Sequence, residues 1–204
     1  MKLLTLNTYS WVQTADPETY AALIADILEN EYDAIALQEV NQLSSGTSVN
    51  EPEGYLPTQN EIPIKSDNFA YFLVKSLAEK GLSYHWSWVP CHQGYFRFDE
   101  GVAILSKAPI QSVEQVQLSV VNDFENIHTR RALALETEAA AFVSVHLSWW
   151  KTEEENPFLL EWTSVETAVK KLRGIKPIYV MGDVNNPADV RNEGYDLITT
   201  AGWQ

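Results

Sequence analysis

Basic residues are scarce in this chain. Its 204 residues include 14 Lys and Arg against 28 Asp and Glu, so the formal net charge is 14 − 28 = −14. Nucleic acids and anionic membranes attract proteins through clustered positive charge, which an excess of negative charge opposes. No basic stripe is visible in the sequence. The composition therefore disfavours loose electrostatic capture by either partner and leaves open only a local basic groove.

The sequence also has only one cysteine, no long apolar run and no N-terminal pattern that resembles a secretory signal. The single Cys91 cannot form an internal disulfide, and the apolar run at residues 3–6 is interrupted by Thr5. Because disulfides and signal peptides mark export to oxidising compartments, we expect a reducing, cytoplasmic location. The longest mostly apolar run, residues 139–150, contains His146 and is shorter than the roughly 20 residues that a membrane helix needs. The sequence predicts no membrane span.

Apolar and aromatic residues, by contrast, are abundant enough for a packed core. They make up 45% and 11% of the chain respectively, and 204 residues fit one large domain. We find no internal repeat and no convincing domain boundary. The expectation is a single domain over residues 1–204.

Apolar patterning predicts strands and helices that alternate at first and then give way to consecutive strands. We expect strands at residues 2–9, 32–40, 83–91, 101–106, 110–118, 131–136, 141–146 and 176–181. Helices are expected after Asp16-Pro17, after Asn156-Pro157 as far as Gly174, and over residues 195–201. This order predicts an α/β (α+β) fold with mixed sheets rather than one parallel sheet.

The segment between the second and third expected strands holds a long loop and a helix. Residues 41–67 are polar and rich in proline, and a loop of this length is usually functional or mobile. Asp67 is expected to cap the helix, which ends before Gly81. Its buried face is expected to carry Phe69, Phe72, Leu73 and Leu77. Another loop, at residues 94–100, could shape specificity.

Oxygen-bearing side chains follow a hydrophobic strand at residues 181–187, Met-Gly-Asp-Val-Asn-Asn-Pro. Gly182 permits a sharp turn, and alternation along an extended chain points Asp183 and Asn185 to one side. A carboxylate and an amide at one place suit a hard divalent cation and an activated water. The alternative is a simple turn, since these residue types are common in turns.

Other expected strands also end in groups of this kind. Asn7 ends the first strand, Glu39 the second and His146 the strand over residues 141–146. Each has a plain structural alternative, because Asn forms turns, a terminal Glu is usually solvated and a half-buried His usually bonds to backbone. Strand ends at one edge of a sheet converge, so together these residues predict a site.

The chain resembles the endonuclease/exonuclease/phosphatase superfamily, which includes pancreatic deoxyribonuclease, abasic-site endonucleases, inositol-polyphosphate phosphatases and neutral sphingomyelinases. The resemblance covers nearly the whole chain and runs through five motifs in the family's order. These are LTLNT at residues 4–8, IALQEV at 35–40, GVAILS at 101–106, VSVHL at 143–147 and VMGDVN at 180–185. The implied fold is the deoxyribonuclease-like four-layer sandwich, with two packed mixed sheets flanked by helices.

The resemblance also implies roles for the site residues. Glu39 would bind a divalent cation, usually Mg²⁺ with Mn²⁺ as an alternative, and Asn7 would lie in the same metal site. Asp183 would position or deprotonate the attacking water, and Asn185 would orient Asp183 and the phosphate. His146 would donate to a phosphate oxygen as negative charge grows. Phosphoryl transfer needs little more from a protein than such positioning and charge stabilisation.

One departure from the family concerns the end of the chain. Family members finish with two further strands and a Ser-Asp-His motif, which does not occur before Gln204. We therefore expect a C-terminally truncated domain. The implied activity is Mg²⁺-dependent hydrolysis of a small-molecule or lipid-like phosphomono- or phosphodiester. One alternative is a nuclease acting on DNA or RNA, which the net charge disfavours, and another is a catalytically weakened binding or scaffold domain.

Three further residues are weaker candidates for substrate binding. Arg130 and Arg131 precede an expected strand and could reach a phosphate, although paired arginines at a strand start are usually solvated. Trp149, three residues past His146, could wall the substrate site, with packing as the alternative. The other histidines show no metal spacing, and Cys91 is expected to act as a small buried hydrophobe. The oligomeric state stays open.

Overall fold

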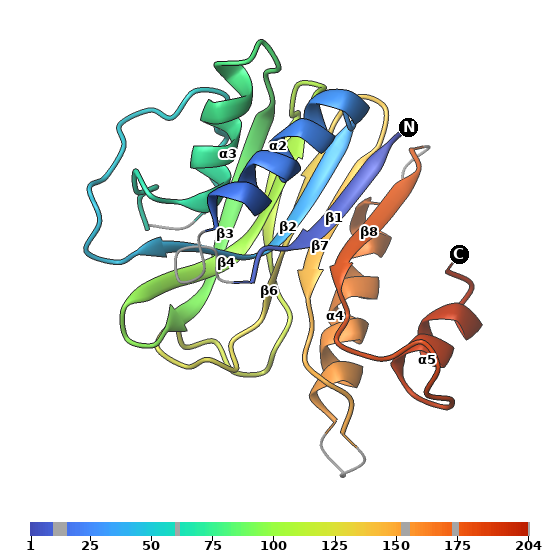
Figure 1. Ribbon diagram of the computed structural model, residues 1–204. Helices are drawn as coiled ribbons and strands as arrows, with labels where there is room; N and C mark the ends of the chain where they lie inside the picture. Colours follow the sequence, from blue (N-terminus) through green and yellow to red (C-terminus); the bar gives the residue numbers. More distant parts are fainter. Residues whose placement is uncertain (10–15, 60–61, 152–155, 173–175, 204) are drawn as a thin grey trace.

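Two sheets packed face to face, with helices on both outer sides, form the protein (Figure 1). The computed structural model describes residues 1–9, 16–59, 62–151, 156–172 and 176–203. Each sheet has four strands, ordered β1-β2-β4-β3 in one and β5-β6-β7-β8 in the other. The predicted four-layer sandwich of mixed sheets is confirmed.

The first sheet combines one parallel and two antiparallel pairings. Its strands are β1 (Leu3–Asn7), β2 (Ala34–Leu43), β3 (His85–Gly94) and β4 (Phe98–Ser106). β1 runs parallel to β2, and β4 pairs antiparallel with both β2 and β3. The loop expected over residues 94–100 is therefore mostly strand. Tyr95 and Phe96 adopt positive φ angles of 52° and 53° and turn the chain within a tight hairpin.

The second sheet has the same mixture. Its strands are β5 (Ser112–Gln117), β6 (Arg131–Glu136), β7 (Ala141–His146) and β8 (Ile178–Asp183). β5, β6 and β7 are antiparallel neighbours, and β8 runs parallel to β7. The predicted bounds of β6 and β7 are confirmed. β8 begins and ends two residues later than predicted, so Asp183 is its last residue rather than part of the following turn.

Helices α2 (Pro17–Asn30) and α3 (Phe69–Ala78) cover the first sheet, and α4 (Pro157–Leu172) covers the second. A short helix, α5 (Gly194–Thr200), follows β8. The Asp16 carboxylate caps α2 as predicted by accepting from the backbone N–H of Thr19 at 3.0 Å. The predicted end of α4 near Gly174 lies outside the described residues. No described helix is both long and apolar enough to cross a bilayer.

The prediction that Asp67 caps α3 is wrong. Asn68 is the cap, and its side-chain oxygen accepts from the backbone N–H of Tyr71 at 3.2 Å. Asp67 instead accepts from the backbone N–H of Leu43 at 2.8 Å and fastens the preceding loop to the end of β2. Phe72 was also misplaced, since it is 43% exposed and contacts the Tyr20 ring at 5.1 Å between centroids. It lies at the border of the buried stripe, where α2 and α3 meet.

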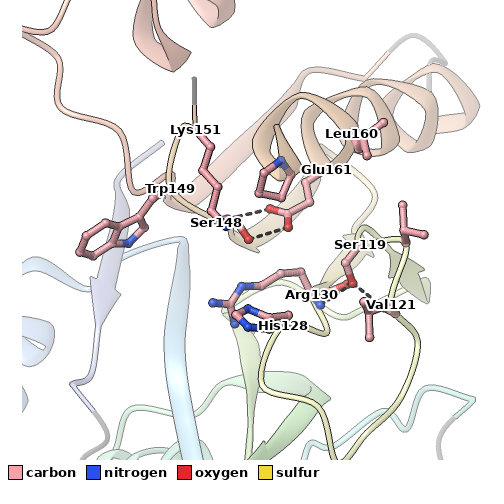
Figure 2. Close-up of a pocket in the computed structure, with 11 residues that line it drawn as sticks. Ser119, Val121, His128, Arg130, Ser148, Trp149, Lys151, Leu160 and Glu161 are labelled. Carbon is pink, nitrogen blue, oxygen red and sulfur yellow. Dashed lines mark hydrogen bonds between the residues drawn. The ribbon is translucent and has the colours of Figure 1, made fainter. Parts of the chain in front are cut away.

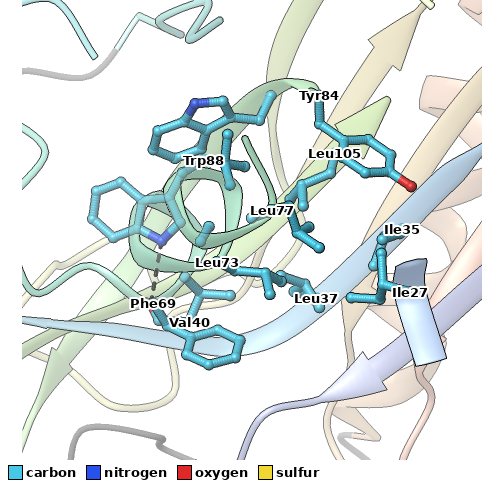
Figure 3. Packing of buried hydrophobic residues seen from close by; sticks show 14 of the residues in the cluster. Ile27, Ile35, Leu37, Val40, Phe69, Leu73, Leu77, Tyr84, Trp88 and Leu105 are labelled. Carbon is cyan, nitrogen blue, oxygen red and sulfur yellow. Dashed lines mark hydrogen bonds between the residues drawn. The ribbon is translucent and has the colours of Figure 1, made fainter. Parts of the chain in front are cut away.

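Three apolar layers hold the sandwich together. The first lies between the first sheet and its two helices, where Trp88 donates its indole N–H to the carbonyl of Val40 at 3.2 Å (Figure 3). The second lies between the sheets and is built from small side chains of β2 and larger ones of β4 and β6, such as Ala36, Ile104 and Leu133. The third lies between the second sheet and α4. This packing fixes the two sheets relative to each other.

Cys91 is buried in the layer between the sheets, as predicted for a small hydrophobe. Burial raises the pKa of its thiol to about 11, so little thiolate exists at neutral pH. We expect native protein to react with Ellman's reagent at pH 8 at least 100-fold more slowly than urea-unfolded protein. A thiol pKa of about 11 in place of 9 lowers the thiolate fraction at pH 8 by about this factor. Equal reaction rates in the two states would contradict this buried environment.

Candidate functional site

Two parallel strand pairs bring their carboxyl ends to one edge of the sandwich. Asn7 at the end of β1 stands opposite Gln38 of β2, and His146 at the end of β7 stands opposite Asp183 of β8. β1 and β8 face each other across the two sheets (Figure 1). Because each strand delivers its last residue to this edge, side chains far apart in the sequence meet there.

Glu39 reaches this edge through a β-bulge, not at the end of a strand as predicted. β2 continues to Leu43, and its pairing with β4 shifts register between Leu37 and Val40. Glu39 occupies the bulge with a φ of 53°. The Thr8 hydroxyl donates to the carbonyls of Gln38 at 2.9 Å and of Glu39 at 2.7 Å. The bulge thus turns Glu39 toward the end of β1.

Asn7 joins the two carboxylates of the site. Its side-chain nitrogen donates to Glu39 Oε1 at 2.9 Å and to Asp183 Oδ2 at 3.1 Å. Its side-chain oxygen accepts from the backbone N–H of Tyr9 at 2.9 Å, which fixes the direction of the amide. One amide donor shared by two carboxylates holds like charges close together.

Asp183 and Asn185 are joined through the backbone of Asn185. Asp183 Oδ1 accepts from the backbone N–H of Asn185 at 2.8 Å, while the Asn185 side chain donates to the carbonyl of Leu147 at 2.8 Å. Leu147 in turn donates its backbone N–H to the carbonyl of Asp183 at 2.9 Å. These bonds tie the chain after β7 to the chain after β8. Asn185 has a φ of 49°, a conformation that Asn tolerates better than most residues.

His146 lies half-buried beside Asp183. Burial lowers the pKa of its imidazole, and the charge of Arg130 lowers it further. Asp183 and Glu39 act in the opposite direction without reversing the net shift. At neutral pH the ring is therefore mainly uncharged and can donate one N–H.

An open cavity of about 310 Å³ lies at this edge. Its walls include Asn7, Asp183 and Asn185, together with Thr5, Gln38 and Asn186. Within the described ranges, no group of three or more His, Cys, Asp and Glu side chains is arranged to hold a metal ion. The donors here are two carboxylates and neighbouring amides. Mg²⁺ and Mn²⁺ suit oxygen donors, and Mg²⁺ often takes only one or two carboxylates with water and phosphate oxygens, so this donor set fits them.

The two predicted arginines have different surroundings. Arg131 donates through its guanidinium to the carbonyl of Pro90 at 2.7 Å and to the side chains of Gln117 at 3.3 Å and Asn122 at 2.9 Å. Arg130 lies close enough to His146 to depress its pKa. Its Nε is buried and has no hydrogen-bond partner among the described residues. Of the two arginines, Arg130 is thus the one whose charge acts on a site residue.

Trp149 stands apart from the carboxylates. It is 71% exposed and lines a second cavity together with Arg130. The structure therefore brings Asn7, Glu39, His146 and the Asp183–Asn185 pair together at one edge. It places Arg130 and Trp149 at the border of that edge.

Two acidic residues near the site escaped the sequence patterns. Glu100 Oε1, on β4, lies 3.4 Å from Nε2 of the buried His92. Burial alone would raise the pKa of Glu100, but His92 and the charges of His146 and Arg130 hold it below its ordinary value. Because it follows Asp99 near a glycine, Glu100 resembled an ordinary turn residue in the sequence.

Glu161 is the second of these residues. Its carboxylate accepts from the backbone N–H and the hydroxyl of Ser148, each at 2.7 Å, and it is 1% exposed. It anchors the segment after His146 to α4. Burial raises its pKa despite these two bonds. A signal existed in the sequence, because Glu161 falls on the buried stripe of α4 between Phe158 and Val165.

Comparison with known proteins decides the family. The sequence profile of the Endonuclease/Exonuclease/phosphatase family matches residues 5–191. The chain belongs to this family. Members of the family are hydrolases that act on phosphoesters. No curated protein sequence matches the chain.

Solved structures agree with this assignment. An endonuclease/exonuclease/phosphatase family protein from Leptotrichia buccalis superimposes with a TM-score of 0.83 at 25% identity, covering 99% of this chain and 74% of that one. ANGEL2, a 2',3'-cyclic phosphatase solved with adenosine-2',3'-vanadate, gives 0.54 at 15% identity, with 88% and 46% covered. TDP2 from D. rerio, solved with a single strand DNA product, gives 0.56 at 13%, with 98% and 64% covered. The last two show the shared fold alone.

Proposed function

We propose that this protein is a Mg²⁺-dependent phosphoesterase that hydrolyses a small-molecule or lipid-like phosphomono- or phosphodiester by attack of water. The observation that carries the proposal is the Asn7 amide, which donates to both Glu39 and Asp183. Two carboxylates held around one donor form a compact acidic centre beside a neutral histidine and an arginine. Such a centre suits a divalent cation and a phosphate oxyanion.

Each side chain has a task in this proposal. Glu39 would hold the cation, with Asn7 beside it in the same site and donating to the Glu39 carboxylate. When bound, the cation would neutralise charge that develops on the phosphoryl oxygens. Asp183 would accept a proton from the attacking water, since its Oδ1 and Oδ2 are oriented by Asn185 and Asn7. Asn185 binds the Asp183 carboxylate through its backbone N–H and the carbonyl of Leu147 through its side chain. It thereby holds the Asp183 carboxylate in place relative to the chain after β7.

His146 and Arg130 would stabilise the phosphate. The lowered pKa keeps the imidazole uncharged at neutral pH, so His146 would donate a neutral N–H as charge accumulates on an equatorial oxygen. The guanidinium of Arg130, which also lines the neighbouring cavity, would supply a second donor. The two side chains enter from β7 and from the start of β6, so they would approach the phosphate from the side of the second sheet.

The net charge of −14 favours a small substrate over a long nucleic acid. A nuclease is the second candidate, since the structurally similar TDP2 was solved with a single strand DNA product. Hydrolysis of p-nitrophenyl phosphate, bis-p-nitrophenyl phosphate and plasmid DNA, with and without Mg²⁺, tests both. We expect Mg²⁺ to stimulate hydrolysis of a p-nitrophenyl ester. Nicking of plasmid at physiological salt without ester hydrolysis would favour the nuclease, and no hydrolysis of any substrate would refute a phosphoesterase.

Glu39→Gln tests the metal site directly. Gln keeps the shape of the side chain but removes the charge, so we expect the Kd for Mg²⁺, measured by isothermal titration calorimetry, to rise at least tenfold, or about 1.4 kcal/mol. Glu29→Gln, an exposed position on α2, is the matched control and should bind Mg²⁺ as the parent does. Unchanged binding by Glu39→Gln would remove Glu39 from the ligands.

A further inference from the structure

A second cavity, of about 570 Å³, is lined by Arg130 and by residues that closely follow His146 in the chain (Figure 2). It lies between the chain that joins β5 to β6, the described residues 148–151 after β7, and the first turns of α4. Arg130 lines it and also acts on the pKa of His146. Ser148 and Trp149, which line the opposite wall, follow His146 closely in the chain. Arg130 and the segment after His146 therefore connect this cavity with the proposed catalytic centre.

The wall of this cavity carries apolar side chains that are exposed to solvent. Val120 is 82% exposed, Trp149 71% and Leu160 50%. They come from three different segments, yet all three line the same cavity, together with Val121. Large apolar side chains from separate segments rarely gather around a solvent-filled hollow unless an apolar group binds there.

Positive charge surrounds this apolar wall in an otherwise acidic chain. Two basic side chains, Arg130 and Lys151, line the cavity together with the imidazole of His128. The one carboxylate in the lining, Glu161, is buried and accepts two hydrogen bonds from Ser148. The cavity therefore offers cations to a ligand that carries both an anion and an apolar part.

The two serine hydroxyls of the cavity already have partners. The Ser119 hydroxyl donates to the carbonyl of Val121 at 2.6 Å and accepts from the backbone N–H of Arg130 at 2.8 Å. The Ser148 hydroxyl donates to Glu161 at 2.7 Å. These hydroxyls are not free to recognise the polar edge of a base or a sugar. The lining therefore suits a ligand group that is recognised by its shape and apolar surface rather than by hydrogen bonds to these hydroxyls.

We infer that this cavity binds the organic group of the substrate, and that this group is apolar. The inference rests on the proposed function and narrows its substrate to phosphoesters that carry a ring-sized aryl or alkyl group next to the phosphate. The phosphate would lie between Arg130 and Asp183, while the apolar group contacts Trp149 and Leu160. Aryl esters and lipid-like alkyl esters share this chemistry.

Binding of phosphonates separates the apolar contribution from hydrolysis, because their C–P bond is not cleaved. We expect phenylphosphonate or hexylphosphonate to bind about tenfold more tightly than methylphosphonate in isothermal titration calorimetry with Mg²⁺ present. The ratio between the first two tells whether aryl or alkyl groups fit better. Equal affinities for all three would overturn the inference.

Substitutions locate the effect in the cavity. Leu160→Ser should weaken binding of the preferred apolar phosphonate about fivefold and leave methylphosphonate unchanged, because only the apolar contact is lost. Leu159→Ser is the matched control, since Leu159 is 37% exposed on the same helix but does not line the cavity. Equal effects of the two substitutions would overturn the assignment to this cavity.

Parallel hydrolysis assays distinguish the two proposals. A protein that prefers apolar phosphonates but cleaves no p-nitrophenyl ester would keep the cavity assignment and refute the phosphoesterase. A protein that cleaves these esters but binds the three phosphonates equally would keep the phosphoesterase and refute the apolar cavity.

Discussion

Replacing Asp183 by asparagine should lower kcat for Mg²⁺-stimulated hydrolysis of bis-p-nitrophenyl phosphate by about 10²–10⁴-fold, the usual contribution of a general base. Asn retains an oxygen that can accept from the backbone N–H of Asn185, so the local turn should persist. It cannot accept a proton from water at neutral pH. The measurement is steady-state kinetics on protein whose circular dichroism matches that of the parent.

The matched control is Asp189→Asn, an exposed acid in the same segment that lies outside the cavity of the site. It makes the same change of charge and should leave kcat within about twofold of the parent's value, because solvent and salt screen an exposed charge. If Asp183→Asn retained the activity of the parent, Asp183 would have no part in activating water, and the proposed role would be wrong.

Gly182→Ala should destabilise the protein by about 3–5 kcal/mol, among the larger effects of single substitutions. Gly182 stands opposite Val145 in the parallel pairing of β7 and β8, with a φ of 147°. A Cβ at this position would meet the carbonyl oxygen of Val145. The two strands would have to separate at the residues that precede His146 and Asp183. Urea unfolding measures the loss of stability.

Gly81→Ala is the control that shows how much of the lost stability comes from backbone strain alone, without a steric clash. Gly81 also has a positive φ, 88°, but a Cβ there would meet nothing within 4 Å. Its substitution should cost only about 1–2 kcal/mol, the usual cost of a left-handed conformation for an L-residue. Similar losses for both substitutions would show that close approach of β7 and β8 at Gly182 is not the cause.

The centre is sensitive to such changes because its parts come from both ends of the chain. Asn7 and Asp183 are 176 positions apart and are joined by one hydrogen bond of 3.1 Å. Their separation depends on how the two sheets pack, so a change in the layer between the sheets acts on the site. Because interiors are closely packed, such changes are not absorbed locally.

The sequence by itself determined which strands would carry the site. Periodicity located β6 and β7 correctly, and residue types at the ends of β1, β7 and β8 indicated Asn7, His146 and Asp183. These features are local: alternation sets the face of each side chain, and a glycine before an acid permits the turn. Five motifs in order then indicated the family that the profile match confirms.

Only the tertiary structure decided how those residues meet. The bulge at Glu39, the Asn7 amide shared by two carboxylates and the Ser148–Glu161 anchor depend on partners far along the chain. The cap of α3 also depends on a distant partner. Asn68 caps the helix, because the Asp67 carboxylate accepts from the backbone N–H of Leu43 in β2. Local propensity cannot rank two neighbouring caps when a distant backbone donor binds one of them.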